Sequence, residues 1–138
     1  MQLGASKLYE VPAEADVDAL LARVTERTRV VFIANPNNPT GTIITHDEME
    51  RLYATLPEEV MIVSDEVYYQ FVRNPAYPDS LAAVMADRKV LVLHSFSKAY
   101  GLAGLRIGIV IAQPDIISHL VHLRRTFHLG TLEMEAAI

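Results

Sequence analysis

Four short apolar segments, each rich in valine and isoleucine, constrain the fold more than any other feature of the sequence. They lie at Val30–Ala34, Val60–Val63, Val90–Leu93 and Ile107–Ile111. Each segment is continuously apolar instead of alternating, which is typical of strands that are buried on both faces of an α/β sheet. The sequence therefore predicts a three-layer α/β fold in which helices enclose a sheet.

Helical patterns precede, separate and follow these strands. We expect helices at Asp16–Val24, at Ser80–Ala86 and from Pro114 to about Phe127. A further helix should begin after Thr45, because Glu48 stands three residues later at capping-box spacing. Helix and strand thus alternate along most of the chain, and this alternation predicts a largely parallel, doubly wound sheet.

The connection to the last strand differs from the others. Residues 95–106 contain Gly101 and Gly104 and are too few and too irregular for the crossover helix that a parallel neighbour requires. We therefore expect Ile107–Ile111 to run antiparallel to the other strands. This arrangement would bring Arg106 to the carboxyl edge of the parallel strands, where open α/β sheets bind their ligands.

Composition narrows the class of protein. The 138 residues suit one domain, and the net charge of −5 is spread without the clusters of Lys and Arg that bind nucleic acid or anionic membranes. The absence of cysteine excludes disulfides and thiolate metal sites, and no third ligand accompanies His119 and His122. No apolar stretch of about 18 residues occurs. We expect a cytoplasmic, metal-free protein that acts on small molecules.

Polar side chains follow each of the three strands that are expected to be parallel, and they should converge on one edge of the sheet. Taken singly, each has an ordinary explanation as a turn former, a helix cap or a surface charge. Together they supply an amine for a Schiff base, a carboxylate for a pyridine nitrogen, and hydroxyls with an arginine for a phosphate. The seven residues are Asn38, Asp65, Tyr68, Ser95, Ser97, Lys98 and Arg106.

Three motifs carry a resemblance to a known family. NPNNPTG begins at Asn35, DEVYYQF at Asp65 and SFSKAYGLAGLRIG at Ser95. In this order and separation they resemble the fold-type-I aminotransferases of class I/II that depend on pyridoxal 5′-phosphate (PLP), and most of all the histidinol-phosphate aminotransferases. Val67, Gln70 and His94 depart from the residues more common at these positions in that group. The resemblance extends over nearly the whole chain.

The resemblance implies a role for each of the seven residues. Lys98 would form a Schiff base with PLP and then act as the base that moves the substrate's proton. Asp65 would pair with the pyridine nitrogen and keep it protonated. The remaining five would bind the two oxygen-bearing groups of the cofactor: Asn38 and Tyr68 the phenolic oxygen, and Ser95, Ser97 and Arg106 the phosphate.

The resemblance also implies the domain organisation and the reaction. Residues 1–138 would be a central part of the PLP-binding large domain of a homodimeric enzyme, without its N-terminal segment and its small domain. The reaction would exchange an amino group between L-histidinol phosphate and 2-oxoglutarate in histidine biosynthesis. We expect the isolated chain to have little or no transaminase activity.

Alternative functions stay open. Another fold-type-I PLP enzyme, such as an aromatic aminotransferase or a decarboxylase of a phosphorylated substrate, would carry the same motifs. The isolated chain could also be an inactive fragment or a cofactor-binding module. A nucleotide hydrolase is disfavoured, because the acidic pair Asp65 and Glu66 after a strand is not accompanied by G-x-x-x-x-G-K-[ST].

Overall fold

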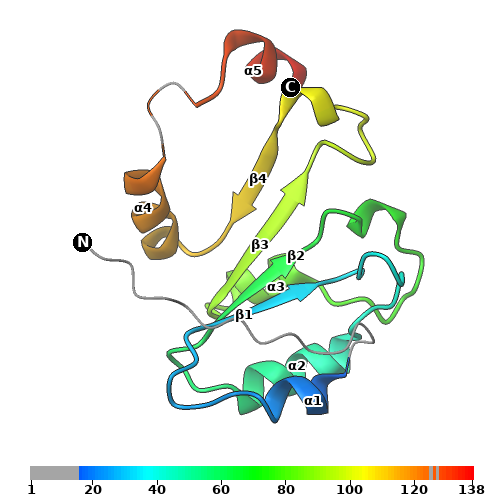
Figure 1. Ribbon diagram of the computed structural model, residues 1–138, viewed down its shortest axis with the longest axis vertical. Coiled ribbons are helices and arrows are strands. Elements are labelled where there is room, and N and C mark those ends of the chain that lie inside the picture. Colours follow the sequence, from blue (N-terminus) through cyan, green and yellow to red (C-terminus); the bar gives the residue numbers. More distant parts are fainter. Residues whose placement is uncertain (1–15, 125, 127) are drawn as a thin grey trace.

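The computed structural model describes residues 16–124, 126 and 128–138, and in them a single four-stranded sheet organises the fold. Its strands follow the chain order: β1 (Val30–Ala34), β2 (Met61–Asp65), β3 (Val90–Ser95) and β4 (Gly108–Ile111). Strands β1, β2 and β3 are parallel, and β4 is antiparallel to β3 (Figure 1). The predicted mostly parallel sheet with one antiparallel strand is confirmed.

The β3–β4 connection explains the reversal of direction. It contains only a short 3-10 helix, η2 (Ala103–Leu105), and its ends are tied by hydrogen bonds from Phe96 N to Ile107 O (3.2 Å) and from Leu102 N to Phe96 O (3.0 Å). Arg106 follows η2 in the left-handed region, with φ of 54°. The strand therefore begins at Gly108, one residue later than predicted.

Five α-helices complete the described chain: α1 (Val17–Leu21), α2 (His46–Thr55), α3 (Ser80–Met85), α4 (Pro114–Leu123) and α5 (Thr131–Ala136). The first four lie where the sequence predicts helices, but three of them are shorter than predicted. Helix α1 ends before Val24 and α3 before Ala86. Helix α4 ends at Leu123 because Arg124 is extended, with ψ of 147°. Phe127, the predicted end of α4, lies outside the described residues.

Side-chain caps determine where α1 and α2 begin. The Asp16 carboxylate accepts a hydrogen bond from Ala19 N (2.9 Å) at the start of α1. The Glu48 carboxylate accepts hydrogen bonds from Thr45 N (2.8 Å) and Thr45 Oγ1 (2.7 Å) at the start of α2. These bonds, above all the one from the Thr45 backbone, hold the pKa of Glu48 below its ordinary value. The predicted capping pair is thus formed.

The hydrophobic core lies on one face of the sheet, beneath α1, α2 and α3. Leu52 of α2 is fully buried there, and the sheet and the helices contribute Val17, Val31, Ile33, Met49, Ile62, Val84, Val90 and Val92. On the opposite face, Val63 of β2 and Leu91 of β3 are also buried, whereas Phe32 of β1 is 68% exposed and Val110 of β4 is 43% exposed. Strand β1 consequently alternates between exposed and buried residues, so the expected burial on both of its faces is wrong for this chain. The second helical layer of a three-layer fold would lie against the exposed outer strands of this face, which is called the open face.

Candidate active site

The loop after β1 is anchored by a buried asparagine. The Asn35 side chain is fully buried, donates from Nδ2 to Ile44 O (3.0 Å) and accepts at Oδ1 from Ile44 N (2.9 Å). The Tyr77 hydroxyl donates to Asn35 O (2.5 Å), and burial, with the nearby Glu66 carboxylate, raises the pKa of Tyr77 so that it stays a donor. These bonds close the loop and present Asn38 at the carboxyl edge of the sheet. Sequence reasoning missed Asn35 and Tyr77.

Three of the predicted residues meet at this edge, from three separate segments of the chain. Asn38 Nδ2 donates to the Tyr68 hydroxyl at 3.4 Å. Lys98 Nζ lies 5.6 Å from the centre of the Tyr68 ring, within the usual range of a cation–π contact. Asn38 follows β1, Tyr68 follows β2 and Lys98 follows β3, so the parallel strands bring the three side chains together.

Asp65 stands at the end of β2, in the middle of the parallel strands. Its backbone neighbours across the sheet are Ala34 on one side and Leu93 on the other. The half-buried carboxylate accepts a hydrogen bond at Oδ1 from Val67 N (3.2 Å). Within the described residues Oδ2 has no such bond, so it can accept one from the N–H of a ligand.

The predicted phosphate-binding residues are only partly gathered. The half-buried Ser95 accepts a hydrogen bond at Oγ from Ser97 N (3.1 Å), so both serines belong to one tight turn at the end of β3. The exposed Arg106 guanidinium donates from Nη1 to Ala103 O (2.9 Å), within its own loop. Arg106 does lie at the expected edge, because Ser95 pairs with Gly108 across β3 and β4. Within the described residues, however, its guanidinium has a hydrogen bond to its own loop and none to either serine.

Lys98 is exposed in this structure. A lysine that forms a Schiff base has to lose its proton readily, which partial desolvation of the amine favours. The described chain does not bury Lys98, because the edge around it is open. Any desolvation has to come from a ligand or from further protein at this edge.

A hydrogen-bonded network behind the edge was also missed by sequence reasoning. The Glu66 side chain is buried, and it accepts a hydrogen bond from Ser64 Oγ (2.9 Å) at Oε1. His94 Nε2 lies 3.1 Å from Glu66 Oε2, and the His94 ring stacks on Tyr69 with 4.1 Å between ring centres. Tyr69 begins the short 3-10 helix η1 (Tyr69–Phe71). The signal in the sequence was that each polar residue of this network stands directly beside a predicted site residue.

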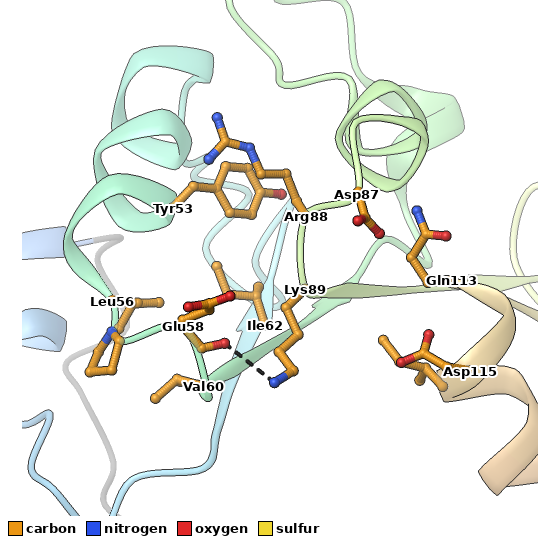
Figure 2. A pocket seen from close by; sticks show the side chains of 12 residues that line it. Tyr53, Leu56, Glu58, Val60, Ile62, Asp87, Arg88, Lys89, Gln113 and Asp115 are labelled. Atoms are coloured by element: carbon orange, nitrogen blue, oxygen red, sulfur yellow. Dashed lines mark hydrogen bonds between the residues drawn. The ribbon is translucent and has the colours of Figure 1, made fainter.

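Two hollows lie at opposite edges of the sheet. One, of about 510 Å³, is lined by the loop after β1, including Asn38, and by Tyr68 and the residues that follow η1. The other, of about 490 Å³, lies at the amino ends of β2 and β3, between Tyr53, Lys89 and Gln113 (Figure 2). There Lys89 Nζ donates to Glu58 O at 3.3 Å, and burial raises the pKa of Tyr53 to about 12. Only the first hollow adjoins the predicted site.

In residues 16–124, 126 and 128–138, no three His, Asp or Glu side chains are grouped to hold a metal ion. None of the helices described there combines the length and apolar character needed to cross a bilayer.

Comparison with known proteins decides the family. The sequence profile of aminotransferase class I and II matches residues 2–138. The chain belongs to this family. The predicted family is therefore confirmed.

Individual relatives carry two different names. An aromatic amino acid aminotransferase of Mycolicibacterium smegmatis is 45% identical over 123 residues, which cover 89% of this chain and 34% of the relative. A histidinol-phosphate aminotransferase of Brevibacillus brevis is 44% identical over 133 residues, which cover 94% of this chain and 36% of the relative. The chain thus spans about a third of the length of these relatives.

A solved structure agrees with this assignment. The histidinol-phosphate aminotransferase of Sinorhizobium meliloti, in complex with pyridoxal-5′-phosphate, superposes with a TM-score of 0.82 at 32% identity. The match covers 92% of this chain and 35% of that protein. The sheet described above is therefore the arrangement found in the same family.

Proposed function

We propose that this chain forms part of the PLP-binding large domain of an aminotransferase, and that a longer polypeptide supplies the small domain and the N-terminal segment. The observation that carries the proposal is the meeting of Asn38, Tyr68 and Lys98 at the carboxyl edge of the sheet. It is supported by membership of the family and by the PLP complex of the Sinorhizobium meliloti relative. The chain covers about a third of the length of the relatives, which supports the longer polypeptide. We propose further that the complete protein is a homodimer.

The donor set at the edge fits the cofactor. When bound, PLP supplies a carbonyl carbon that condenses with amines and a ring that accepts electrons. The Lys98 amine is the group that would attack this carbonyl and, once displaced by the substrate, take up and return the proton at the substrate's Cα. The Asp65 carboxylate would accept a hydrogen bond from the pyridine N–H at Oδ2. A negative charge at that point keeps the ring nitrogen protonated.

The remaining residues would hold the cofactor's oxygen atoms. The Asn38 amide and the Tyr68 hydroxyl already share a hydrogen bond, and both can donate to the phenolic oxygen. The hydroxyls of Ser95 and Ser97 would donate to the phosphate. Arg106 would add a charged fork once its side chain turns from Ala103 O toward the serines. Holding the ring and the phosphate at once fixes the carbonyl relative to Lys98.

For the substrate, we propose L-histidinol phosphate as amino donor and 2-oxoglutarate as acceptor, in histidine biosynthesis in the cytoplasm. The Brevibacillus brevis and Sinorhizobium meliloti relatives support this choice. An aromatic amino acid is the second candidate donor, supported by the 45% identical Mycolicibacterium smegmatis relative. The comparison to make is kcat/KM for L-histidinol phosphate and for L-phenylalanine with the protein of the complete reading frame. A preference for L-phenylalanine would reverse the order of the two candidates.

The cofactor assignment is tested by comparing the two lysines that lie before and after strand β3. Lys98 follows β3 at its carboxyl end, and Lys89 precedes β3 at the opposite edge (Figure 2). We expect the complete protein to bind PLP with a visible absorption band and to keep the cofactor through borohydride reduction and denaturation. Lys89→Ala should behave in the same way. Lys98→Ala should lose all covalent retention, and PLP that stays attached to this variant would refute the assignment.

A further inference from the structure

The buried network consists of residues that are sequence neighbours of proposed cofactor residues. Ser64 and Glu66 flank Asp65, Tyr69 follows Tyr68, and His94 precedes Ser95. These residues come from three segments of the chain and meet in space. Glu66 accepts a hydrogen bond from Ser64 and contacts His94, and the His94 ring stacks on Tyr69. The four residues Ser64, Glu66, His94 and Tyr69 are termed the inner network.

Strand geometry explains how the two sets are related. Successive side chains of a strand point to opposite faces of the sheet. Ser64 and His94 therefore lie on the face that carries the core, and Asp65 and Ser95 lie on the other. Asp65 is held in register by the hydrogen bonds from Asn35 N to Asp65 O and from Glu66 N to Leu93 O, both 2.9 Å. A shift of the inner network would move Asp65 and Ser95 with the backbone.

The Glu66 and His94 side chains are largely shielded from solvent and are hydrogen-bonded. Side-chain exposure is 5% for Glu66 and 11% for His94. A carboxylate so deeply buried is tolerated only with good hydrogen bonds, and Glu66 has one at each oxygen. Gly108 adds a further constraint, since a Cβ there would lie 3.0 Å from His94 O. The ends of β2, β3 and β4 are thus packed together around His94.

We propose that the inner network positions the cofactor-binding edge: Glu66 and His94 lock the ends of β2 and β3 so that Asp65 and Ser95 meet the ring nitrogen and the phosphate together. These are positioning residues, since they lie behind the edge and act through their neighbours. The inference rests on the proposed function, because it assumes that Asp65 and Ser95 bind PLP. It assigns a purpose to a buried Glu–His pair that the cofactor contacts themselves do not use.

The test separates the hydrogen bond from the ring stack at His94. In the complete protein, His94→Phe keeps a ring on Tyr69 but removes the donor to Glu66, whereas His94→Gln keeps a donor and removes the ring. Ser64→Ala removes one hydrogen bond of Glu66 and is the milder variant if His94→Phe does not fold. Arg51→Gln is the matched control, because it removes an exposed pair with Asp18. Each protein is measured for PLP dissociation constant, for circular dichroism of bound PLP and for apoprotein unfolding temperature.

We expect His94→Phe and Ser64→Ala to weaken PLP binding, His94→Phe by about tenfold, as removal of outer-shell partners does at metal sites. The circular dichroism band of bound PLP should change with it, because the ring is held differently. His94→Gln and Arg51→Gln should stay near the wild-type values. Wild-type PLP binding and circular dichroism in His94→Phe and Ser64→Ala, with only a lower unfolding temperature, would overturn the positioning role alone. Failure of the wild-type protein to bind PLP would overturn the proposed function as well.

Discussion

At the carboxyl edge of the sheet, side chains on the core side and on the open side differ in their hydrogen bonding. On the core side, Glu66 has a hydrogen bond at each carboxylate oxygen, and Asn35 bonds Ile44 through both atoms of its amide. On the open side, and within the described residues, the exposed Asn38 has one long hydrogen bond and the exposed Arg106 bonds only a carbonyl of its own loop. Glu66 and Asn35 are therefore satisfied by the chain, whereas Asn38 and Arg106 retain capacity for a ligand.

This difference shows how one short segment serves two purposes. Asp65 and Glu66 are adjacent acidic residues, but alternation along the strand sends them to different surroundings. A buried carboxylate has to be hydrogen-bonded within the protein, and an edge carboxylate does not. Rigid backing on one side lets the other side keep binding groups in place before any ligand arrives, which lowers the ordering cost of binding.

The largest predicted effect tests the burial that underlies this comparison. Leu52→Ala should lower the free energy of unfolding by about 2–5 kcal/mol, since Leu52 is fully buried and its removal leaves a cavity. Phe32→Ala, on the open face, should cost less than about 1 kcal/mol, because Phe32 is already 68% exposed. Urea denaturation of the 138-residue chain measures both. Equal losses would show that the open face is covered in solution, and dependence on protein concentration would identify self-association as the cause.

Two asparagines of one loop give the next largest effect. Asn35→Ala should lower the free energy of unfolding by about 1–3 kcal/mol, because it leaves the Ile44 backbone groups unpaired in the core. Asn38→Ala should change it by less than about 0.5 kcal/mol, as expected for an exposed side chain. In the complete protein Asn38→Ala should instead weaken PLP binding. A stability loss in Asn38→Ala as large as that in Asn35→Ala would contradict the prediction that only the core-side asparagine stabilises the fold.

Much of the fold could be predicted because it depends on local patterns. Valine- and isoleucine-rich runs located the strands, and the short glycine-containing connection after Ser95 was enough to predict the antiparallel direction of β4. Helix ends were less accurate, because Arg124 turns to an extended conformation that periodicity does not register. Burial on both faces of β1 was wrong, since it depends on what packs against Phe32 and not on the strand itself.

The candidate site could be predicted as a set of residues but not as a geometry. Strand order alone brings Asn38, Tyr68 and Lys98 to one edge, and they do meet. The orientation of Arg106 depends on its left-handed backbone and on Ala103 O, which no motif specifies. The Glu66–His94 pair was missed because its partners lie 28 residues apart and come together only through strand register. The roles of the seven site residues stay predictions.

The smallest predicted effect concerns a group on the core side that is held without being deeply buried. Hydrogen bonds from Thr45 lower the pKa of Glu48 from its ordinary 4.5 in the folded chain. The ionised carboxylate therefore contributes stability above the pKa of the unfolded chain, and this contribution is lost as the pH falls through the lower folded pKa. Glu48→Gln, which can still reach the cap, should cost less than about 1 kcal/mol at pH 7, and the difference from wild type should shrink toward pH 3.

Urea denaturation of both proteins from pH 7 to pH 3 measures this difference. Glu59→Gln, at an exposed position, is the control and should track the wild type at every pH. A gap between wild type and Glu48→Gln that stays constant with pH would contradict the lowered pKa, because the cost would then come from the amide and not from the charge. A difference in unfolding free energy that shrinks toward pH 3 would show that the hydrogen bonds from Thr45 stabilise the ionised Glu48 carboxylate. Glu48 would then resemble Glu66 and Asn35, whose polar groups are bonded within the chain.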